Sequence, residues 1–395
     1  MQPLRILHVT PYFTDAWAYG GIPRLAHSLA RGLARRGHQV TVCTTDARDA
    51  STRLESPSCT RTADGVEVRI FANLSNRLAY HLQFFLPLGL HTYLQRHAPG
   101  FDVAHLHACR NVPGAIAAYH LRKTGVPYVL APNGTAPRIE RRRTAKLVFD
   151  VVAGRRVLDG ATRVLAVSDV ERAQLAELGV PESAIRMIPN PVDLDEFAEP
   201  VTRGAFRERI ARPSGPLVVF LGKLTPRKRL DVLVRAFARL RRTDAQLVIA
   251  GNDMGGGAAA RSLVHTLGLE RRTVFTGLLR GRERLQALAD ADVVVYPSEH
   301  EIFGLVPLES LLSGTPVIVA DDSGCGAIVR AVGGGEVVAR GDADALARAI
   351  EGVLADPCRW REAATAAAPR IRAAYGDDVV CGQIEGLYDE MVNRP

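Results

Sequence analysis

Short apolar runs alternate along this chain with longer segments whose apolar residues have helical spacing, and this alternation limits the possible fold classes. Runs rich in Val and Ile, such as Arg5–Val9 and Gln39–Thr44, flank the segment Arg24–Arg36, whose apolar residues recur at helical spacing. This alternation is typical of βαβ units, in which helices cover a parallel sheet. A run that is apolar throughout, Val164–Val167, fits a strand buried on both faces. The sequence therefore predicts an α/β fold with doubly wound parallel sheets. Further strands are expected at Val66–Phe71, Val103–Leu106 and Tyr128–Ala131.

The same alternation begins again in the second half of the chain. A run at Leu217–Leu221 is followed by a helical segment at Leu230–Leu240 and by another run at Gln246–Ala250. Because 395 residues exceed the usual size of one domain, two such domains are expected. The remaining strands are expected at Thr273–Thr276, Val293–Tyr296 and Pro316–Val319.

A proline-rich segment separates the two halves. It contains Pro189 and Pro191, and proline interrupts both helices and strand ladders. We therefore predict a first domain over residues 1–195 and a second over residues 196–375. The tail, residues 376–395, predicts an amphipathic helix, which packs either on the second domain or back toward the first.

Composition limits the class of protein and of partner. No apolar run of about 18 residues occurs, and the first residues lack the features of a signal peptide, so a cytoplasmic protein is expected. The six cysteines are scattered and form no Cys-x-x-Cys pair, which argues against a disulfide framework or a zinc site. The net charge of +8 favours an anionic partner such as a phosphate group or a membrane surface.

Two common nucleotide-binding motifs are missing from the sequence. No Gly-x-Gly-x-x-Gly follows the first strand, and no Walker phosphate loop occurs. Gly255–Gly257 follows a strand and is expected to form a surface turn. A dehydrogenase or a P-loop enzyme is therefore disfavoured, although the fold class would permit either.

The strongest chemical signal is a pair of glutamates, Glu301 and Glu309, placed after the strand Val293–Tyr296. A helix is expected to begin near Gly304 or Leu305, so that Glu301 lies in the loop and Glu309 about one turn inside the helix. Ligands of open α/β sheets bind beyond the carboxyl ends of strands, and a helix N-terminus there favours an anion. A pyrophosphate between two carboxylates that bind hydroxyl groups fits this pattern. An ordinary helix with an acidic first turn is the alternative.

The motif E-x-F-G-x-x-x-x-E-x-x-x-x-G-x-P-V, over Glu301–Val317, resembles the retaining glycosyltransferase family 4, which has the GT-B fold of two Rossmann-like domains facing across a cleft. Other segments resemble the family's motifs in the same chain order. They are the glycine pair Gly20–Gly21, the strand end Asp102–His107, the hinge Ile188–Asp193 and the basic loop Gly222–Lys228.

The resemblance implies a role for each matching residue. Glu309 binds the ribose of the nucleotide, Glu301 binds the donor sugar at the catalytic centre, and Lys223 and Lys228 neutralise the pyrophosphate. His107 lies near the acceptor and the donor sugar, whereas His105 is better explained as a structural histidine. The remaining donor-binding positions are Gly21, Gly222, Phe303, Gly304 and Leu305.

The chain departs from the family pattern at four positions. Lys223 replaces the usual arginine, Arg229 and Pro191 replace glycines, and Ile302 stands where glycine is frequent. Lys223 keeps the charge of arginine but not its forked hydrogen bonding. These departures bear on donor recognition more than on the class of reaction.

A lysine-assisted departure of the diphosphate requires no metal ion, because fixed cations and a helix N-terminus stabilise the developing charge. Two Asp-x-Asp segments, Asp290–Asp292 and Asp342–Asp344, resemble metal motifs of the other glycosyltransferase fold. Asp342 is better explained as a helix N-cap. No metal and no cofactor are expected, and the donor substrate is a UDP- or GDP-sugar.

The acceptor belongs to the first domain by the same resemblance. A glycan or a lipid-linked acceptor is expected, and nucleic acid is not. A basic cluster suggests peripheral contact with the inner face of an anionic membrane, or simply a solvated helix face. The apolar stretch Leu82–Leu90 is either core or lining of the acceptor groove. The basic cluster consists of Arg138, Arg141, Arg142, Arg143, Lys146, Arg155 and Arg156.

The predicted function is a retaining, metal-independent hexosyltransferase of cell-surface polysaccharide or glycolipid synthesis. A sugar-nucleotide epimerase on the same fold is an alternative that needs no acceptor. A two-domain sugar-binding protein is a third hypothesis, disfavoured because such proteins are usually exported.

Overall fold

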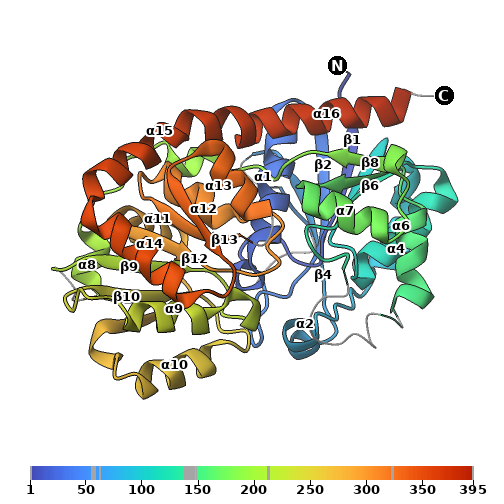
Figure 1. Ribbon diagram of the computed structural model, residues 1–395. Helices are drawn as coiled ribbons and strands as arrows, with labels where there is room; N and C mark the ends of the chain where they lie inside the picture. Colours follow the sequence, from blue (N-terminus) through green and yellow to red (C-terminus); the bar gives the residue numbers. More distant parts are fainter. Residues whose placement is uncertain are drawn as a thin grey trace. The chain divides into compact units, whose positions relative to one another are not determined.

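The computed structural model of the 395-residue chain describes residues 2–54, 59–61, 64–137, 147, 149–210, 214–321 and 324–393, of which 59–61 are described by their backbone alone. The chain forms two compact units (Figure 1). The first comprises Met1–Pro191 together with Asp377–Pro395, and the second comprises Val192–Gly376. The C-terminal helix is therefore part of the first unit, although it lies far from that unit in the sequence.

The first unit contains an eight-stranded sheet with the order β3-β4-β2-β1-β5-β6-β7-β8. All of its pairings are parallel except that of β3 with β4. The strands are β1 (Arg5–Val9), β2 (Gln39–Thr45), β3 (Cys59–Arg61), β4 (Glu67–Phe71), β5 (Val103–His107), β6 (Tyr128–Ala131), β7 (Arg163–Ala166) and β8 (Ile185–Met187). The helices are α1 (Gly21–Arg35), α2 (Asn76–Leu82), α3 (Leu90–His97), α4 (Val112–Thr124), a π-helical turn at Asp150–Gly154, α6 (Arg155–Asp159), α7 (Asp169–Glu177) and α16 (Asp377–Asn393).

Both faces of the centre of this sheet are buried, because alternate residues of the central strands enter different cores. Ile6 of β1 packs in a core with α1 and α16, whereas Leu7 packs in a second core with α3 and α4. Burial on both faces explains why the strands read as continuous apolar runs in the sequence. The α/β class predicted from those runs is confirmed.

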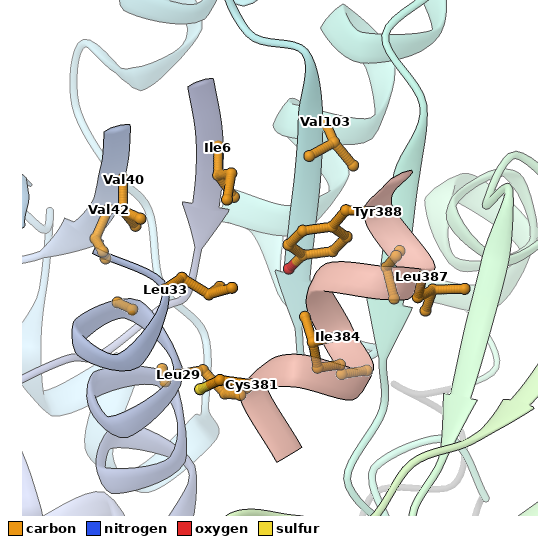
Figure 2. Close-up of a cluster of buried hydrophobic side chains, with 14 of the residues drawn as sticks. Ile6, Leu29, Leu33, Val40, Val42, Val103, Cys381, Ile384, Leu387 and Tyr388 are labelled. Atoms are coloured by element: carbon orange, nitrogen blue, oxygen red, sulfur yellow. The ribbon is translucent and has the colours of Figure 1, made fainter. Parts of the chain in front are cut away.

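Helix α16 completes the first core. Its apolar side chains Cys381, Ile384 and Tyr388 lie beside α1 and the strands (Figure 2). Gly32 of α1 permits the close approach, since a Cβ there would stand 2.4 Å from the Cys381 Sγ. Polar contacts hold the same helix, with Glu385 at 2.7 Å from the Arg36 guanidinium. Helix α16 therefore covers part of the sheet of the first unit, although it comes from the end of the sequence.

The second unit contains a six-stranded parallel sheet with the order β11-β10-β9-β12-β13-β14. Numbered within the unit, this is 3-2-1-4-5-6, the order of a doubly wound nucleotide-binding sheet. The strands are β9 (Leu217–Leu221), β10 (Gln246–Ala250), β11 (Thr273–Gly277), β12 (Val293–Tyr296), β13 (Val317–Asp321) and β14 (Gly335–Ala339). The helices are α8 (Ala205–Arg209), α9 (Leu230–Ala238), α10 (Gly257–Thr266), α11 (Gly281–Asp290), α12 (Leu305–Leu312), α13 (Gly324–Val332), α14 (Ala343–Ala355) and α15 (Pro357–Tyr375). Short 3-10 turns lie at Leu194–Phe197 and Pro226–Lys228.

Every strand predicted from the sequence is present, with ends that agree or differ by at most two residues. The strands that were not predicted are β3, β8 and β14. Strands β3 and β8 contain only three residues each, and β14 begins with Gly335 and carries Glu336. Such segments lack the long apolar run on which the prediction depended.

Candidate active site

The predicted donor residues come together at the switch point of the second sheet. Strand β9 lies between β10 and β12. The chain continues from β9 to β10 on one side and from β12 to β13 on the other, so the two connections run in opposite directions. The loops that follow β9 and β12 therefore diverge, and in this class of sheet ligands bind where such loops diverge. The first loop carries Gly222–Lys228, and the second carries Glu301.

At this switch point Lys228 and Glu301 form an ion pair, and Tyr296 joins it. The Lys228 ammonium donates to the Glu301 carboxylate and to the Tyr296 hydroxyl, and that hydroxyl lies 3.1 Å from the same carboxylate. The ammonium also lies 4.4 Å from the centre of the Tyr296 ring. The side chains are 6 % and 16 % exposed for Lys228 and Glu301 respectively. The three groups thus form one nearly buried polar cluster.

Two opposing effects act on the Glu301 carboxyl. Burial raises its pKa, but the nearby cations Lys228 and Arg227 outweigh that effect, so its pKa stays below its usual value. Burial also raises the pKa of Tyr296 well above its usual value. At neutral pH the cluster therefore holds a carboxylate, which accepts hydrogen bonds, and a neutral phenol, which donates one.

The second predicted glutamate, Glu309, is 1 % exposed and lies in the second turn of α12. Its carboxylate accepts a hydrogen bond from Arg284 of α11. A second nitrogen of the same guanidinium lies 2.6 Å from Glu196, in the turn Leu194–Phe197. The structure thus places Glu309 about one turn inside α12, as the sequence predicts, and adds an arginine partner that was not predicted.

The glycine before α12 has a clear physical reason. Gly304 has φ +81°, and a Cβ there would stand 2.9 Å from the Cys325 Sγ. Helix α12 begins at Leu305, within the predicted start, and its first amides follow Gly304 directly.

Two other predicted donor residues lie in the same loops. Phe303 is buried and packs edge-on against Tyr375, with ring centres 5.6 Å apart. Lys223 lies in the loop after β9 and is half-buried.

Arg229 occupies a backbone conformation that favours glycine. Its φ is +50°, at the N-cap of α9, which gives a reason for glycine at this position in the family pattern. Its guanidinium pairs with Asp231 at 3.0 Å and with Glu299. Hydrogen bonding to Asp231 raises the pKa of Arg229 despite partial burial.

We expect Arg229→Gly to be more stable than Arg229→Ala by about 1 kcal/mol, because a non-glycine residue in the left-handed region costs roughly 1–2 kcal/mol. Both variants lose the same ion pairs, so their difference isolates the backbone effect. Urea unfolding of the two variants measures it. An alanine variant that equals or exceeds the glycine variant in stability would contradict this explanation.

In the first unit, Gly21, expected near the donor phosphates, and His107, expected near the acceptor and the donor sugar, also lie at a switch point, between β1 and β5. Gly20 and Gly21 follow β1 and begin α1, with Gly20 at φ +99°. His107 ends β5, is 1 % exposed, and its Nε2 lies 3.1 Å from Nδ1 of His8. Burial lowers the pKa of His107 to about 3, so the ring is neutral at physiological pH.

His105 precedes His107 in the same strand, β5. Its ring stacks on that of His107 at 4.4 Å, and its Nδ1 lies 2.6 Å from the Tyr388 hydroxyl of α16. It is fully buried. These contacts connect the sheet to α16 and fit the structural role expected for His105.

The Asp-x-Asp segments have structural partners. Asp290 accepts hydrogen bonds from three backbone amides, including that of Phe206 at 2.8 Å, and Asp292 pairs with Arg207 at 2.6 Å. Asp342 caps α14, which confirms the N-cap prediction. In the described parts of the chain no group of three or more His, Cys, Asp or Glu side chains is placed to hold a metal ion.

Of the candidate lipid-contact residues, Arg155 and Arg156 lie among the described residues. Arg138, Arg141, Arg142, Arg143 and Lys146 lie outside the described residues. Arg155 pairs with Asp159 on the exposed face of α6. In the stretch Leu82–Leu90, Phe85 is core and Phe84 is 43 % exposed. Within the ranges that the structure describes, no helix is long and apolar enough to cross a membrane.

Sequence reasoning missed two residues of the site, Tyr296 and Arg284. Tyr296 ends the apolar strand β12, and nothing in the sequence around it indicates a role in the site. A signal for Arg284 existed, because it precedes Leu285 and Leu288 on the buried face of α11. A charged residue on an apolar helical face requires a buried partner of opposite charge.

Two α/β units of this topology, with a basic loop and a glutamate meeting at a switch point, define a glycosyltransferase of the GT-B type. Residues 203–371 match the family model described as glycosyl transferases group 1, and residues 19–196 match the model described as Glycosyltransferase Family 4. The chain belongs to this glycosyltransferase family, which confirms the resemblance read from its motifs.

Similar proteins agree with this assignment. The chain is 31 % identical to a D-inositol 3-phosphate glycosyltransferase of Kineococcus radiotolerans, over 90 % of this chain and 87 % of the relative. A protein of the same name from Acidothermus cellulolyticus is also 31 % identical, over 95 % and 87 % of the two chains. Among solved structures, Anabaena Alr3699/HepE in complex with UDP and glucose has a TM-score of 0.78 at 19 % identity, covering 97 % of this chain and 99 % of that one. At that identity the likeness shows the fold alone.

Proposed function

We propose that the chain is a retaining, metal-independent hexosyltransferase that moves a sugar from a UDP- or GDP-sugar to a glycan or lipid-linked acceptor. The observation that carries this proposal is the Lys228–Glu301 pair at the switch point beside the start of α12. It places a cation, a carboxylate and free helix amides around this switch point. This is the charge pattern that a sugar diphosphate requires.

Each group then has a chemical task. Lys223, Lys228 and the amides after Gly222 and Gly304 balance the charge of the departing diphosphate. Glu301 accepts hydrogen bonds from sugar hydroxyls, and Glu309 accepts them from the ribose. Phe303 and Leu305 shape the donor pocket around the start of α12. Gly21 and His107 act from the first unit, which holds the acceptor.

The reaction that fits these tasks is a same-face displacement. The bond between the anomeric carbon and the diphosphate oxygen breaks while the acceptor oxygen bonds to that carbon on the same face. The acceptor proton passes to the leaving diphosphate oxygen. Glu301 is not assigned as a covalent nucleophile, because Lys228 and Tyr296 already engage its carboxylate.

The place of action in the cell follows from the substrates. A nucleotide sugar is a cytoplasmic metabolite, so we place the enzyme in the cytoplasm, in peripheral contact with the anionic inner face of the membrane when its acceptor is lipid-linked. Synthesis of a cell-surface polysaccharide or glycolipid is the corresponding process. The net charge of +8 supports attraction to such a surface.

The test begins with a thermal-shift panel of UDP, GDP, ADP and their sugars. For the nucleotide that binds, we expect Glu309→Ala to weaken affinity about tenfold, since a lost hydrogen bond to a charged group has roughly that effect. Titration calorimetry measures the dissociation constants. Unchanged affinity would contradict the ribose assignment.

Product analysis then tests the reaction. The preferred donor is incubated with glycan and lipid-linked acceptors, and with D-inositol 3-phosphate because relatives carry that name. Transfer with retained anomeric configuration, at the same rate in EDTA, is the expected result. An inverted product would contradict the same-face step, a loss of activity in EDTA would contradict metal independence, and an epimerised donor without acceptor would indicate the epimerase.

A further inference from the structure

The ion cluster around Arg284 joins three separate parts of the second unit. Arg284 lies in the first turn of α11, Glu309 lies in α12, and Glu196 lies in the turn Leu194–Phe197. The Arg284 side chain is 8 % exposed, that of Glu309 is 1 % exposed and that of Glu196 is 31 % exposed. One guanidinium thus serves two carboxylates through different nitrogens, Nη1 for Glu309 and Nη2 for Glu196.

The burial of Glu309 makes its cation partner necessary. An ionised carboxylate away from water is costly unless it is paired and hydrogen-bonded, and without a partner its pKa rises until it is neutral. Arg284 supplies both the charge and the direction, because a planar guanidinium fixes the orientation of the carboxylate that it binds. Glu196 in turn binds the other side of that guanidinium, at 2.6 Å.

We propose that Arg284 is a positioning residue that keeps Glu309 ionised and oriented to accept hydrogen bonds from the ribose hydroxyls of the donor. This inference rests on the proposed function, in which Glu309 binds the ribose. An ionised carboxylate only accepts hydrogen bonds, whereas a protonated one also donates and is a weaker acceptor. Arg284 therefore acts on the nucleotide through Glu309 and does not touch the reacting atoms.

A ribose-specific measurement tests this proposal. UDP and 2′-deoxy-UDP, or the guanosine pair if GDP is the nucleotide that binds, are titrated at pH 6 and pH 8.5. We expect the wild-type protein to prefer the ribose form about tenfold at both pH values. In Arg284→Met the preference is expected to fall to about twofold at pH 6 and to return in part at pH 8.5, because loss of the guanidinium charge favours the protonated form of the buried Glu309 carboxyl and a higher pH favours the ionised form.

The control is Arg282→Met, two residues away on the same helix. Arg282 is exposed and pairs with Glu199 at 3.0 Å, so its loss removes an ion pair of α11 without touching Glu309. It is expected to keep the wild-type preference at both pH values. Arg284→Lys restores the charge without the fork and is expected to restore much of the preference at pH 6. If Arg284→Met does not fold, Arg284→Gln, which keeps hydrogen-bond donors but not the charge, carries the test, and a preference equal to that of the wild type at both pH values overturns the proposal.

The failure of this inference is distinguishable from that of the proposed function. If Glu309→Ala abolishes the ribose preference while Arg284→Met keeps it at both pH values, Arg284 is not a positioning residue and the donor site stands. If Glu309→Ala itself keeps the preference, the ribose assignment fails, and this inference fails with it.

Discussion

Replacing Lys228 with methionine is expected to lower the rate of sugar transfer by two to three orders of magnitude. The ammonium is the buried cation of the Lys228–Glu301–Tyr296 cluster, beside the place where the diphosphate charge develops. Removing one preorganised donor from such a site typically costs about 10²–10³ in kcat. The kcat and KM of the preferred donor, measured under saturating acceptor, are the relevant quantities.

The same substitution leaves Glu301 nearly buried without its main cation, so stability is expected to fall as well. Loss of one partner of a buried pair costs about 3–5 kcal/mol, and the 16 % exposure of Glu301 places this site below that range. The double variant Lys228→Met/Glu301→Gln removes the unpaired charge. It is expected to recover thermal stability without recovering activity, which separates the chemical role from the structural one.

Two controls complete this experiment. Lys123→Met changes an exposed lysine at the end of α4 and is expected to leave rate and stability unchanged. Tyr296→Phe keeps the ring 4.4 Å from the ammonium and removes only the hydroxyl, so a smaller loss of rate is expected. A Lys228→Met enzyme with a kcat within twofold of the wild type would rule out the assigned role.

Acidification from pH 6.5 to pH 5 is expected to lower the free energy of unfolding of the first unit by about 3 kcal/mol. Burial lowers the pKa values of His8 and His105 well below their usual value, with neighbouring histidines contributing, and lowers that of His107 to about 3. In the unfolded chain each titrates near pH 6.5. The unfolded state therefore binds more protons at and below that pH. Each histidine destabilises the fold with a slope that rises from about 0.7 kcal/mol per pH unit at pH 6.5 toward about 1.4 kcal/mol per pH unit at pH 5.

One buried carboxyl acts in the opposite direction. Burial raises the pKa of Glu171 to about 7 although the amides of Gly134 and Val167 donate to it. Its stabilising contribution is complete below the unfolded pKa near 4.5 and is lost as the pH rises through 7. Between pH 6.5 and 5 it therefore offsets about one of the three histidines. The net effect is a large fraction of the whole stability of a small domain, about 5–15 kcal/mol.

The two tryptophans make this measurement possible for one unit at a time. Trp17 lies in the first unit and Trp360 in the second. In Trp360→Phe, urea unfolding followed by tryptophan fluorescence reports the first unit alone. Adding His105→Phe is expected to reduce the slope of stability against pH by about one proton, whatever its effect on absolute stability. A transition of the first unit that is independent of pH from 6.5 to 5 would contradict the prediction.

Much of the donor site was predictable from local sequence. Helix α12 begins where a strand, a loop and Gly304 predict a start, and short motifs assign Glu301 and Lys228 to the site without knowledge of their contact. These features are predictable because strand ends and helix starts depend on a few neighbouring residues. Tyr296 and Arg284 were missed because each reads as an ordinary member of its own strand or helix, and its importance depends on a residue elsewhere in the chain.

The α/β class, most strands of both halves and the family could be predicted from the sequence alone, since periodicity, helix signals and motif spacing are local properties. Only the tertiary structure decided that α16 joins the core of residues 1–191, that His8 meets His107, and that Arg284 binds both Glu196 and Glu309. These contacts join residues from 25 to more than 280 positions apart in the chain. Their energies come from burial and from pairing between charges, which depend on the three-dimensional neighbours of a residue and leave no local periodicity in the sequence.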